Sequence, residues 1–133
     1  MKIESRLFRS ATLEGMADEK GVPTEEYLAL YRELAQKGVQ NIITGCTFVS
    51  QDGRMVQPGQ AGIDNNTVIP AYQKVTESVH QFNAEIYLQI SHAGRQTSAN
   101  VTGKQVVGAS GKRSPYFLSK PKMLSLQEIE RII

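Results

Sequence analysis

The chain has 133 residues, of which 40% are apolar, and a formal net charge of +2. This length suits one domain with a modest core, and the apolar content lies well above that of disordered chains. The basic residues are scattered, so nothing indicates a nucleic-acid partner or an acidic membrane surface. Cys46 is the single cysteine, which excludes an internal disulfide and fits a reducing compartment. No apolar run has the length of a membrane span and no signal peptide is visible, so we expect a cytoplasmic protein.

Three apolar segments predict β-strands. The predicted strands cover residues 5–11, 39–44 and 85–91. In the third, Ile86, Leu88 and Ile90 alternate with polar residues, which predicts one aliphatic face and one polar face. Gln89 lies in this strand, and a buried amide needs a hydrogen-bonding partner.

Helices are predicted between these strands. Thr24 is a good N-cap for the first helix, which ends at Lys37–Gly38. The second begins near Ile69–Pro70 and ends by Asn83. The intervening connection, residues 48–69, has a length that is usually functional.

The C-terminal part of the chain is less regular. Residues 97–121 are rich in Gly, Ser, Thr and Lys, with a small hairpin expected around Gly103–Lys104. Ser125 and Glu128 form a capping box that predicts a last helix, whose apolar face begins at Ile129 and ends at the final residues.

The alternation of strands and helices predicts parallel strands joined by right-handed crossovers. Three parallel strands cannot close a barrel and would leave two open edges. We therefore expect an α/β fold of the TIM-barrel, (β/α)8 type, of which residues 1–133 form the N-terminal portion, about the first three β/α units. On this view the chain is truncated.

Two common alternatives are not supported. A Rossmann domain needs a glycine-rich turn directly after the first strand, whereas Ser10–Gly15 does not match that fingerprint. His80 and His92 are separated by a strand, and no carboxylate–histidine spacing resembles a metal site, so we predict no metal. We expect His80 to be a surface residue of the second helix.

Small or hydrogen-bonding residues lie at the carboxyl ends of all three predicted strands. These segments are Ser10–Leu13, Thr44–Thr47 and Gln89–His92. The carboxyl ends of parallel strands are where α/β folds bind ligands. Small residues allow a flat ligand to approach the backbone, and an amide offers both a donor and an acceptor. The pattern favours a planar heterocycle, although such small residues also occur for packing alone.

Four segments, in this order and at this spacing, resemble the old yellow enzyme family of NADH:flavin oxidoreductases. The segments are Arg6–Thr12, Gly38–Gly45, Pro58–Ile63 and His92–Gln96. Each alone is weak, but the ordered set covers nearly the whole chain, and Gln89 followed by His92–Arg95 is distinctive. The resemblance implies an FMN-binding β/α barrel that oxidises NAD(P)H and reduces an activated alkene or another small-molecule acceptor.

The resemblance also implies which residues contact the flavin. Ser10, Ala11, Thr12 and Leu13 match the segment that lies against the flavin ring, largely through backbone groups. Cys46 and Gln89 match residues at the pyrimidine edge, whereas His92 and Arg95 are assigned a structural or neighbouring role.

Two departures from the family pattern matter. Many members have proline at the position of Ala11, and cysteine or threonine at that of Leu13, where a side-chain hydrogen bond tunes the flavin. The family's substrate-binding histidines, its proton-donating tyrosine and its phosphate-binding arginines follow later strands, so the catalytic residues here are unknown.

Two other hypotheses remain open at this stage. The chain could be a non-catalytic structural piece that pairs its open strand edges in a homo-oligomer, which we expect in either case. It could also be a barrel module that binds another planar or phosphorylated ligand.

Overall fold

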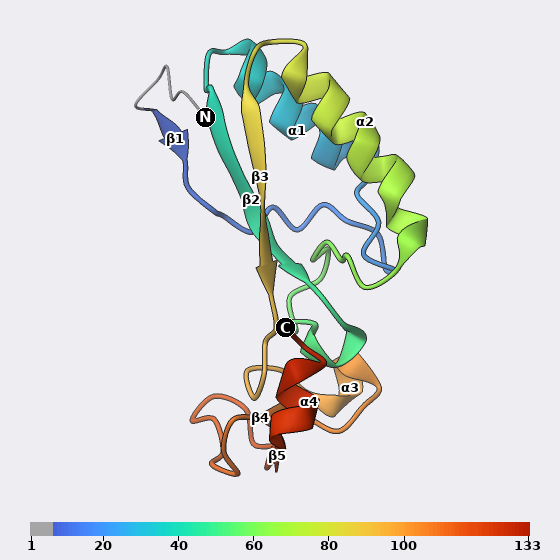
Figure 1. Ribbon diagram of the computed structural model, residues 1–133, viewed down its shortest axis with the longest axis vertical. Coiled ribbons are helices and arrows are strands. Elements are labelled where there is room, and N and C mark those ends of the chain that lie inside the picture. The colour runs from blue at the N-terminus through green and yellow to red at the C-terminus, as the bar shows by residue number, and fades with distance from the viewer. Residues whose placement is uncertain (1–6) are drawn as a thin grey trace.

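The computed structural model describes residues 7–133, and three parallel strands form its main sheet. They are β1 (Phe8–Arg9), β2 (Asn41–Phe48) and β3 (Glu85–Ser91), in the order β1-β2-β3 (Figure 1). The predicted parallel order is confirmed, and β2 has both β1 and β3 as neighbours. The expected first strand, residues 5–11, is wrong in length: β1 has two residues, and positions 5 and 6 lie outside the described part.

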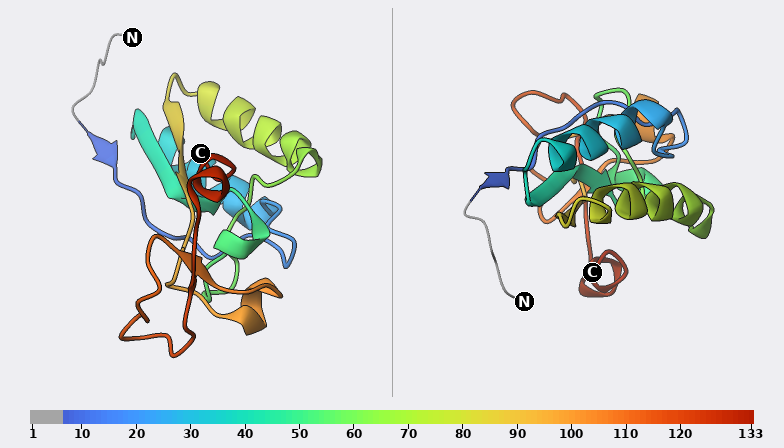
Figure 2. Two further views of the ribbon diagram at one scale, coloured as in Figure 1. Left: turned by 60° about the horizontal axis from the view of Figure 1, so that its bottom comes forward. Right: turned by 90° about the horizontal axis from the view of Figure 1, so that it is seen from above.

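Two helices cover one face of this sheet. In α1 (Glu25–Gln36), the hydroxyl of Thr24 accepts a hydrogen bond from Tyr27 N, as the N-cap prediction requires. In α2 (Ile69–His80), a proline occupies the first turn. The two helices pack against each other (Figure 2). His80 is exposed, as expected.

The core lies between these helices and the sheet. It includes Tyr27, Tyr31, Ile42, Val75 and Val79, all at most 2% exposed. Ile42 is the register partner of Ile86, which packs against the same core. Side chains alternate between the two faces of a strand, so the neighbouring residues Ile43 and Tyr87 point to the other face. Within residues 7–133, no helix covers that face.

The strand β2 is longer than the sequence predicted. It runs to Phe48, so Gly45, Cys46 and Thr47 lie inside the strand rather than beyond its end. In this part of the strand, the hydroxyls of Thr44 and Thr47 both donate hydrogen bonds to Gly45 O.

The remaining elements are short. They are the 3-10 helices η1 (Gln51–Gly53) and η2 (Asn66–Val68), the helices α3 (Ala99–Thr102) and α4 (Leu126–Glu130), and the strands β4 (Val107–Gly108) and β5 (Lys122–Met123). The hairpin expected around Gly103–Lys104 is wrong. Gly103 has φ of 66° and ends α3 in the left-handed conformation, and β4 pairs with β5 in parallel. The capping box at Ser125 and Glu128 is confirmed.

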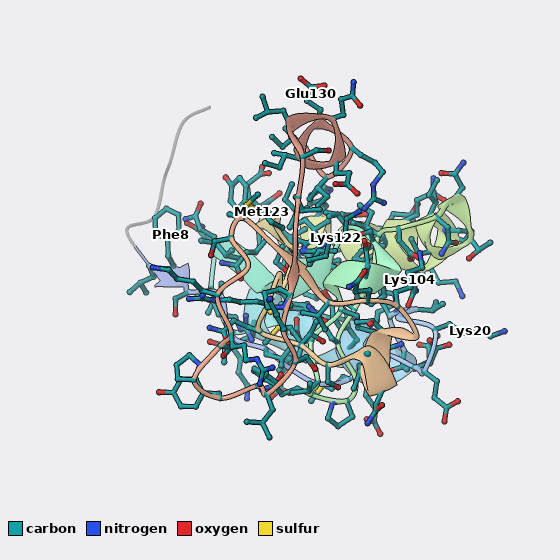
Figure 3. The ribbon with its side chains drawn as sticks, turned by 90° about the horizontal axis from the view of Figure 1, so that it is seen from below. Phe8, Lys20, Lys104, Lys122, Met123 and Glu130 are labelled. Carbon is teal, nitrogen blue, oxygen red and sulfur yellow. The ribbon has the colours of Figure 1, made fainter. Side chains whose placement is uncertain are left out.

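These C-terminal elements gather beyond the carboxyl ends of β2 and β3 (Figure 1). Seen from below, Lys122 and Met123 of β5 cross the middle of the molecule, whereas Phe8 of β1 lies at its periphery (Figure 3). Between residues 7 and 133, no helix has both the length and the apolar character needed to cross a membrane.

Candidate functional site

A β-bulge near the end of β2 brings two predicted site residues together. Ile43 is the register partner of Tyr87, but the next recorded pair is Cys46 with Gln89. From Ile43 to Cys46 is three steps on β2, whereas from Tyr87 to Gln89 is two steps on β3, so β2 carries one extra residue. Register partners in a sheet point to the same face. Cys46 and Gln89 therefore lie side by side on the face that bears no helix.

The backbone of Gln89 is fixed by a side chain of the bulge. Gln89 N donates to the hydroxyl of Thr44 at 3.1 Å, and that hydroxyl donates to Gly45 O at 3.0 Å. Thr44 is 2% exposed, so this bond forms away from water. The hydroxyl of Thr44 thus helps to fix the backbone of Gln89.

The side chain of Gln89 is exposed, which corrects the expectation of a buried amide. Its neighbour Ile90 is also 63% exposed, because no part of residues 7–133 covers this end of β3. Alternation predicted which residues share a face, but not what covers each face. Within the described chain, the Gln89 side-chain amide has no hydrogen-bonding partner, so both its donor and its acceptor are available.

The predicted segment Ser10–Leu13 lies against the bulge. A Cβ placed on Gly45 would be 2.8 Å from both Leu13 Cα and Thr12 O, so only glycine permits this approach. Ser10 and Thr12 are exposed, and Ala11 and Leu13 are half-buried. This segment lies at the same end of the sheet as Cys46 and Gln89, so the structure brings all three predicted parts of the site together.

Arg9 holds the start of that segment. Its guanidinium donates to Ile43 O at 2.8 Å, to Thr12 O at 3.2 Å and to Ser10 O at 3.4 Å. The guanidinium also lies 5.2 Å from the ring centre of Tyr31. Because β1 stops at Arg9, these bonds replace the missing strand ladder.

Glu14 holds the other end of the segment. Its carboxylate accepts hydrogen bonds from Gly45 N, at 3.1 Å, and from the hydroxyl of Tyr31. Tyr31 is fully buried on α1, and its hydroxyl lies 3.2 Å from Gly45 N. Neither Glu14 nor Arg9 was predicted as a site residue from the sequence. The sequence feature that could have indicated them is that these two charged residues flank the uncharged segment Ser10–Leu13.

Gln60 supports Cys46 from the following loop. Its amide donates to Cys46 O at 3.1 Å and accepts from Met55 N at 2.7 Å, and Gln60 is fully buried. The sulfur atoms of Cys46 and Met55 are 3.2 Å apart. Gln60 belongs to the segment Pro58–Ile63 that carried the resemblance, but the sequence did not show its role.

His92 has a packing role. Its ring occupies the space beside Gly53, where a Cβ would come within 2.4 Å of it, and its Nδ1 accepts from Gly94 N at 2.9 Å. Nε2 lies 3.9 Å from Asp52, whose carboxylate is bound by Arg131 of the C-terminal segment at 2.9 Å. Burial lowers the pKa of His92, which the charge of Asp52 opposes and that of Arg131 reinforces.

Arg95 contacts the loop that precedes β5. Its guanidinium donates to Lys112 O at 3.0 Å. Arg95 and His92 thus hold loops around the carboxyl end of β3, in agreement with the structural or neighbouring role that the resemblance implied.

An apolar hollow lies on the opposite face. It has a volume of about 270 Å³ between α2 and β3, and its lining includes Tyr72, Ile86 and Leu88. This hollow offers few polar groups and is separated from Gln89 by the sheet. No group of three His, Cys, Asp or Glu residues between positions 7 and 133 could hold a metal ion.

Comparison with known proteins identifies the family of the chain. The model of the NADH:flavin oxidoreductase / NADH oxidase family matches residues 1–133. The chain belongs to this family. An NADH oxidase of Thermoanaerobacter brockii is 30% identical over 98% of the chain, and an N,N-dimethylglycine/sarcosine dehydrogenase of Chromohalobacter salexigens is 30% identical over all of it.

The fold agrees with that of a solved member of the family. The old yellow enzyme homologue from Zymomonas mobilis superposes with a TM-score of 0.79 at 28% identity, over 96% of this chain and 38% of that one. The predicted fold class is thus confirmed: the chain has the fold of one part of a TIM-type barrel. It spans 20% of the length of both curated relatives named above.

The residues present fit one wall of a flavin site. A free amide stands beside a small half-buried residue, and a backbone segment lies alongside at the same sheet end. An isoalloxazine edge presents N–H and C=O groups together, which the amide of Gln89 can match. The described residues of this wall do not form a binding site for the phosphate group of FMN.

Proposed function

We propose that this chain forms the flavin wall of an FMN-dependent oxidoreductase that oxidises NAD(P)H and reduces a small-molecule acceptor, such as an activated alkene. The observation that carries the proposal is the pairing of Cys46 with the free amide of Gln89 beside the segment Ser10–Leu13. Membership of the family supports it. Bound FMN would supply the redox chemistry, and the protein would bind and orient it.

Each part of the wall has a separate role in this proposal. The amide of Gln89 pairs with the pyrimidine edge, and Thr44 holds its backbone in place. Cys46 lies beside that amide and gives a small surface next to the ring. Ser10, Ala11, Thr12 and Leu13 present the backbone against which the flat ring lies. The side chain of Leu13 offers no hydrogen bond, so any contact between that side chain and the flavin is apolar.

The test uses the protein expressed from its complete coding sequence. Purified protein should carry flavin absorbance, release FMN on denaturation, and oxidise NADH or NADPH when an activated alkene is added. Assaying both nucleotides separately determines the donor preference. A colourless protein that does not bind added FMN would contradict the proposal and favour a module for another planar ligand.

We also propose that the protein is a cytoplasmic homo-oligomer. Apolar side chains are exposed along both edges of the sheet: Leu7 is 68% exposed, Phe8 49% and Ile90 63%. Open edges of this kind pair either with further strands of the same barrel or with a second copy of the protein. Sedimentation over a range of concentrations tests this, and a monomer at all concentrations would contradict it. The free Cys46 fits a reducing compartment, which localisation of a tagged protein would test.

A further inference from the structure

Glu14 stands out because the proposed flavin contacts do not use it, yet it bonds to the backbone at the centre of the site. Its carboxylate accepts a hydrogen bond from Gly45 N at 3.1 Å and another from the hydroxyl of the buried Tyr31. A Cβ on Gly45 would lie 2.1 Å from this carboxylate. The carboxylate of Glu14 therefore packs so closely against Gly45 that no side chain fits between them, and it also accepts the hydrogen bond of Gly45 N.

The bulge explains why a carboxylate is needed there. An extra residue in a strand leaves a backbone group without its ladder partner, and an unpaired N–H in a largely buried position is costly. Gly45 is buried, and its N–H turns away from β3 toward Glu14. The carboxylate and the hydroxyl of Tyr31 together satisfy it.

The same bond fixes the Ser10–Leu13 segment. This segment has no strand ladder, because β1 ends at Arg9. Arg9 holds its first half through Ser10 O and Thr12 O, and Glu14 is the residue directly after its last member. Tyr31 contacts both, with its ring beside Arg9 and its hydroxyl on Glu14.

We propose that Glu14 is a positioning residue of the cofactor site: its carboxylate anchors the Ser10–Leu13 segment to the bulge of β2 and so fixes the surface against which the flavin lies. This inference rests on the proposed function. Glu14 acts through Gly45 and Leu13 and does not itself touch the flavin.

The test compares three replacements of Glu14 in the complete protein. Glu14→Gln keeps an oxygen acceptor of the same length, Glu14→Ala removes it, and Glu14→Asp keeps the charge but shortens the reach. We expect Glu14→Ala and Glu14→Asp to weaken FMN binding about tenfold or more, as when a largely buried N–H loses its acceptor. Glu14→Gln should stay within about threefold of wild type. The control is Glu26→Ala, on the exposed side of α1.

A second readout separates positioning from loss of folding. Hydrogen exchange of Gly45 N–H should accelerate in Glu14→Asp while the amides of β3 stay protected, and the flavin absorption bands should shift in the same variant. Equal FMN affinity in Glu14→Ala, Glu14→Asp and wild type would overturn the inference while leaving the proposed function intact. Absence of flavin binding in the wild type would instead overturn the proposed function.

Discussion

Cys46 on β2 is the register partner of Gln89 on β3. The preceding pair is Ile43 with Tyr87, and in a regular ladder the residue opposite Gln89 would be Gly45. The extra residue therefore decides which side chain stands beside Gln89. Bulges commonly re-aim side chains next to active sites. Here the bulge turns Cys46 to the face that bears no helix and leaves Gly45 beside Thr12 and Leu13.

Replacing Gln89 with leucine should weaken FMN binding in the complete protein. Leucine removes the amide that pairs with the pyrimidine edge, so polar groups of the bound flavin lose their partner. The expected loss is about 1–3 kcal/mol of binding free energy. Fluorescence titration with FMN measures it, with Gln81→Leu, an exposed position after α2, as the control. Equal affinity of the Gln89 variant and the wild type would remove Gln89 from the site.

Replacing Thr44 with valine should destabilise the protein. Valine has nearly the same shape but no hydroxyl, so Gln89 N loses the acceptor that lies 3.1 Å away. We expect the free energy of unfolding to fall by about 1–3 kcal/mol. Urea denaturation measures this. The control is Thr76→Val, because the hydroxyl of Thr76 only donates to carbonyls of its own helix. An equal effect at both positions would show that Thr44 does not specifically support the bulge.

Local signals predicted the helices well. Thr24 and Ser125 each bond to a backbone N–H three residues away, so their capping role is readable from a few neighbouring residues. The parallel order of the strands also followed, since it depends on the alternation of strands and helices along the chain.

The bulge could not be predicted because its partners are distant in sequence. Glu14 lies 31 residues from Gly45, and Thr44 lies 45 residues from Gln89. The site residues were assigned from a family resemblance. The resemblance indicated their positions but not the residues that hold them in place through hydrogen bonds. Gly103 illustrates a local ambiguity: glycine is common both in hairpins and at helix ends, and here it ends α3.

Replacing Gly53 with alanine should destabilise the loop that carries His92. The new Cβ would lie 2.4 Å from the imidazole ring, which is held by its bond from Gly94 N and cannot swing freely. We expect a loss of about 1–3 kcal/mol in the free energy of unfolding, as for other overpacked sites. Gly111→Ala is the matched control, since no atom lies within 4 Å of its Cβ. Thermal unfolding of both variants decides this, and equal melting temperatures would contradict the expectation.

His92 should make stability depend on pH. Burial lowers its pKa in the folded protein, so the unfolded chain takes up the proton first as the pH falls. The contribution to stability is therefore complete above about pH 6.5 and is lost as the pH falls from there to the folded pKa. Burial raises the pKa of Asp52, but the nearby hydroxyl of Ser50 and guanidinium of Arg131 outweigh this, so Asp52 stays ionised throughout that range.

The measurement compares wild type with His92→Gln, which keeps a polar group near the position of Nε2. Denaturant titrations between pH 5 and 7.5 should show wild type losing stability relative to the variant as the pH decreases. Parallel pH profiles would mean that His92 has the same proton affinity in the folded and unfolded protein.

Residues 1–133 alone should not turn over substrate. The main sheet of the described residues 7–133 has three strands, and the aligned part of the Zymomonas mobilis homologue is 38% of that chain. In β/α barrels a phosphate is commonly bound by the loops after the seventh and eighth strands. Without that anchor the flavin would lie against one wall, with its other side open to water.

The acceptor would also lack the groups that orient it, and orientation can account for several kcal/mol of a reaction barrier. The experiment is to mix residues 1–133 with FMN and NADH and to follow NADH oxidation at 340 nm against the rate with free FMN. We expect equal rates. A clearly faster reaction, from a species that sedimentation shows to be a monomer, would mean that the wall formed by Ser10–Leu13, Cys46 and Gln89 is sufficient for the chemistry.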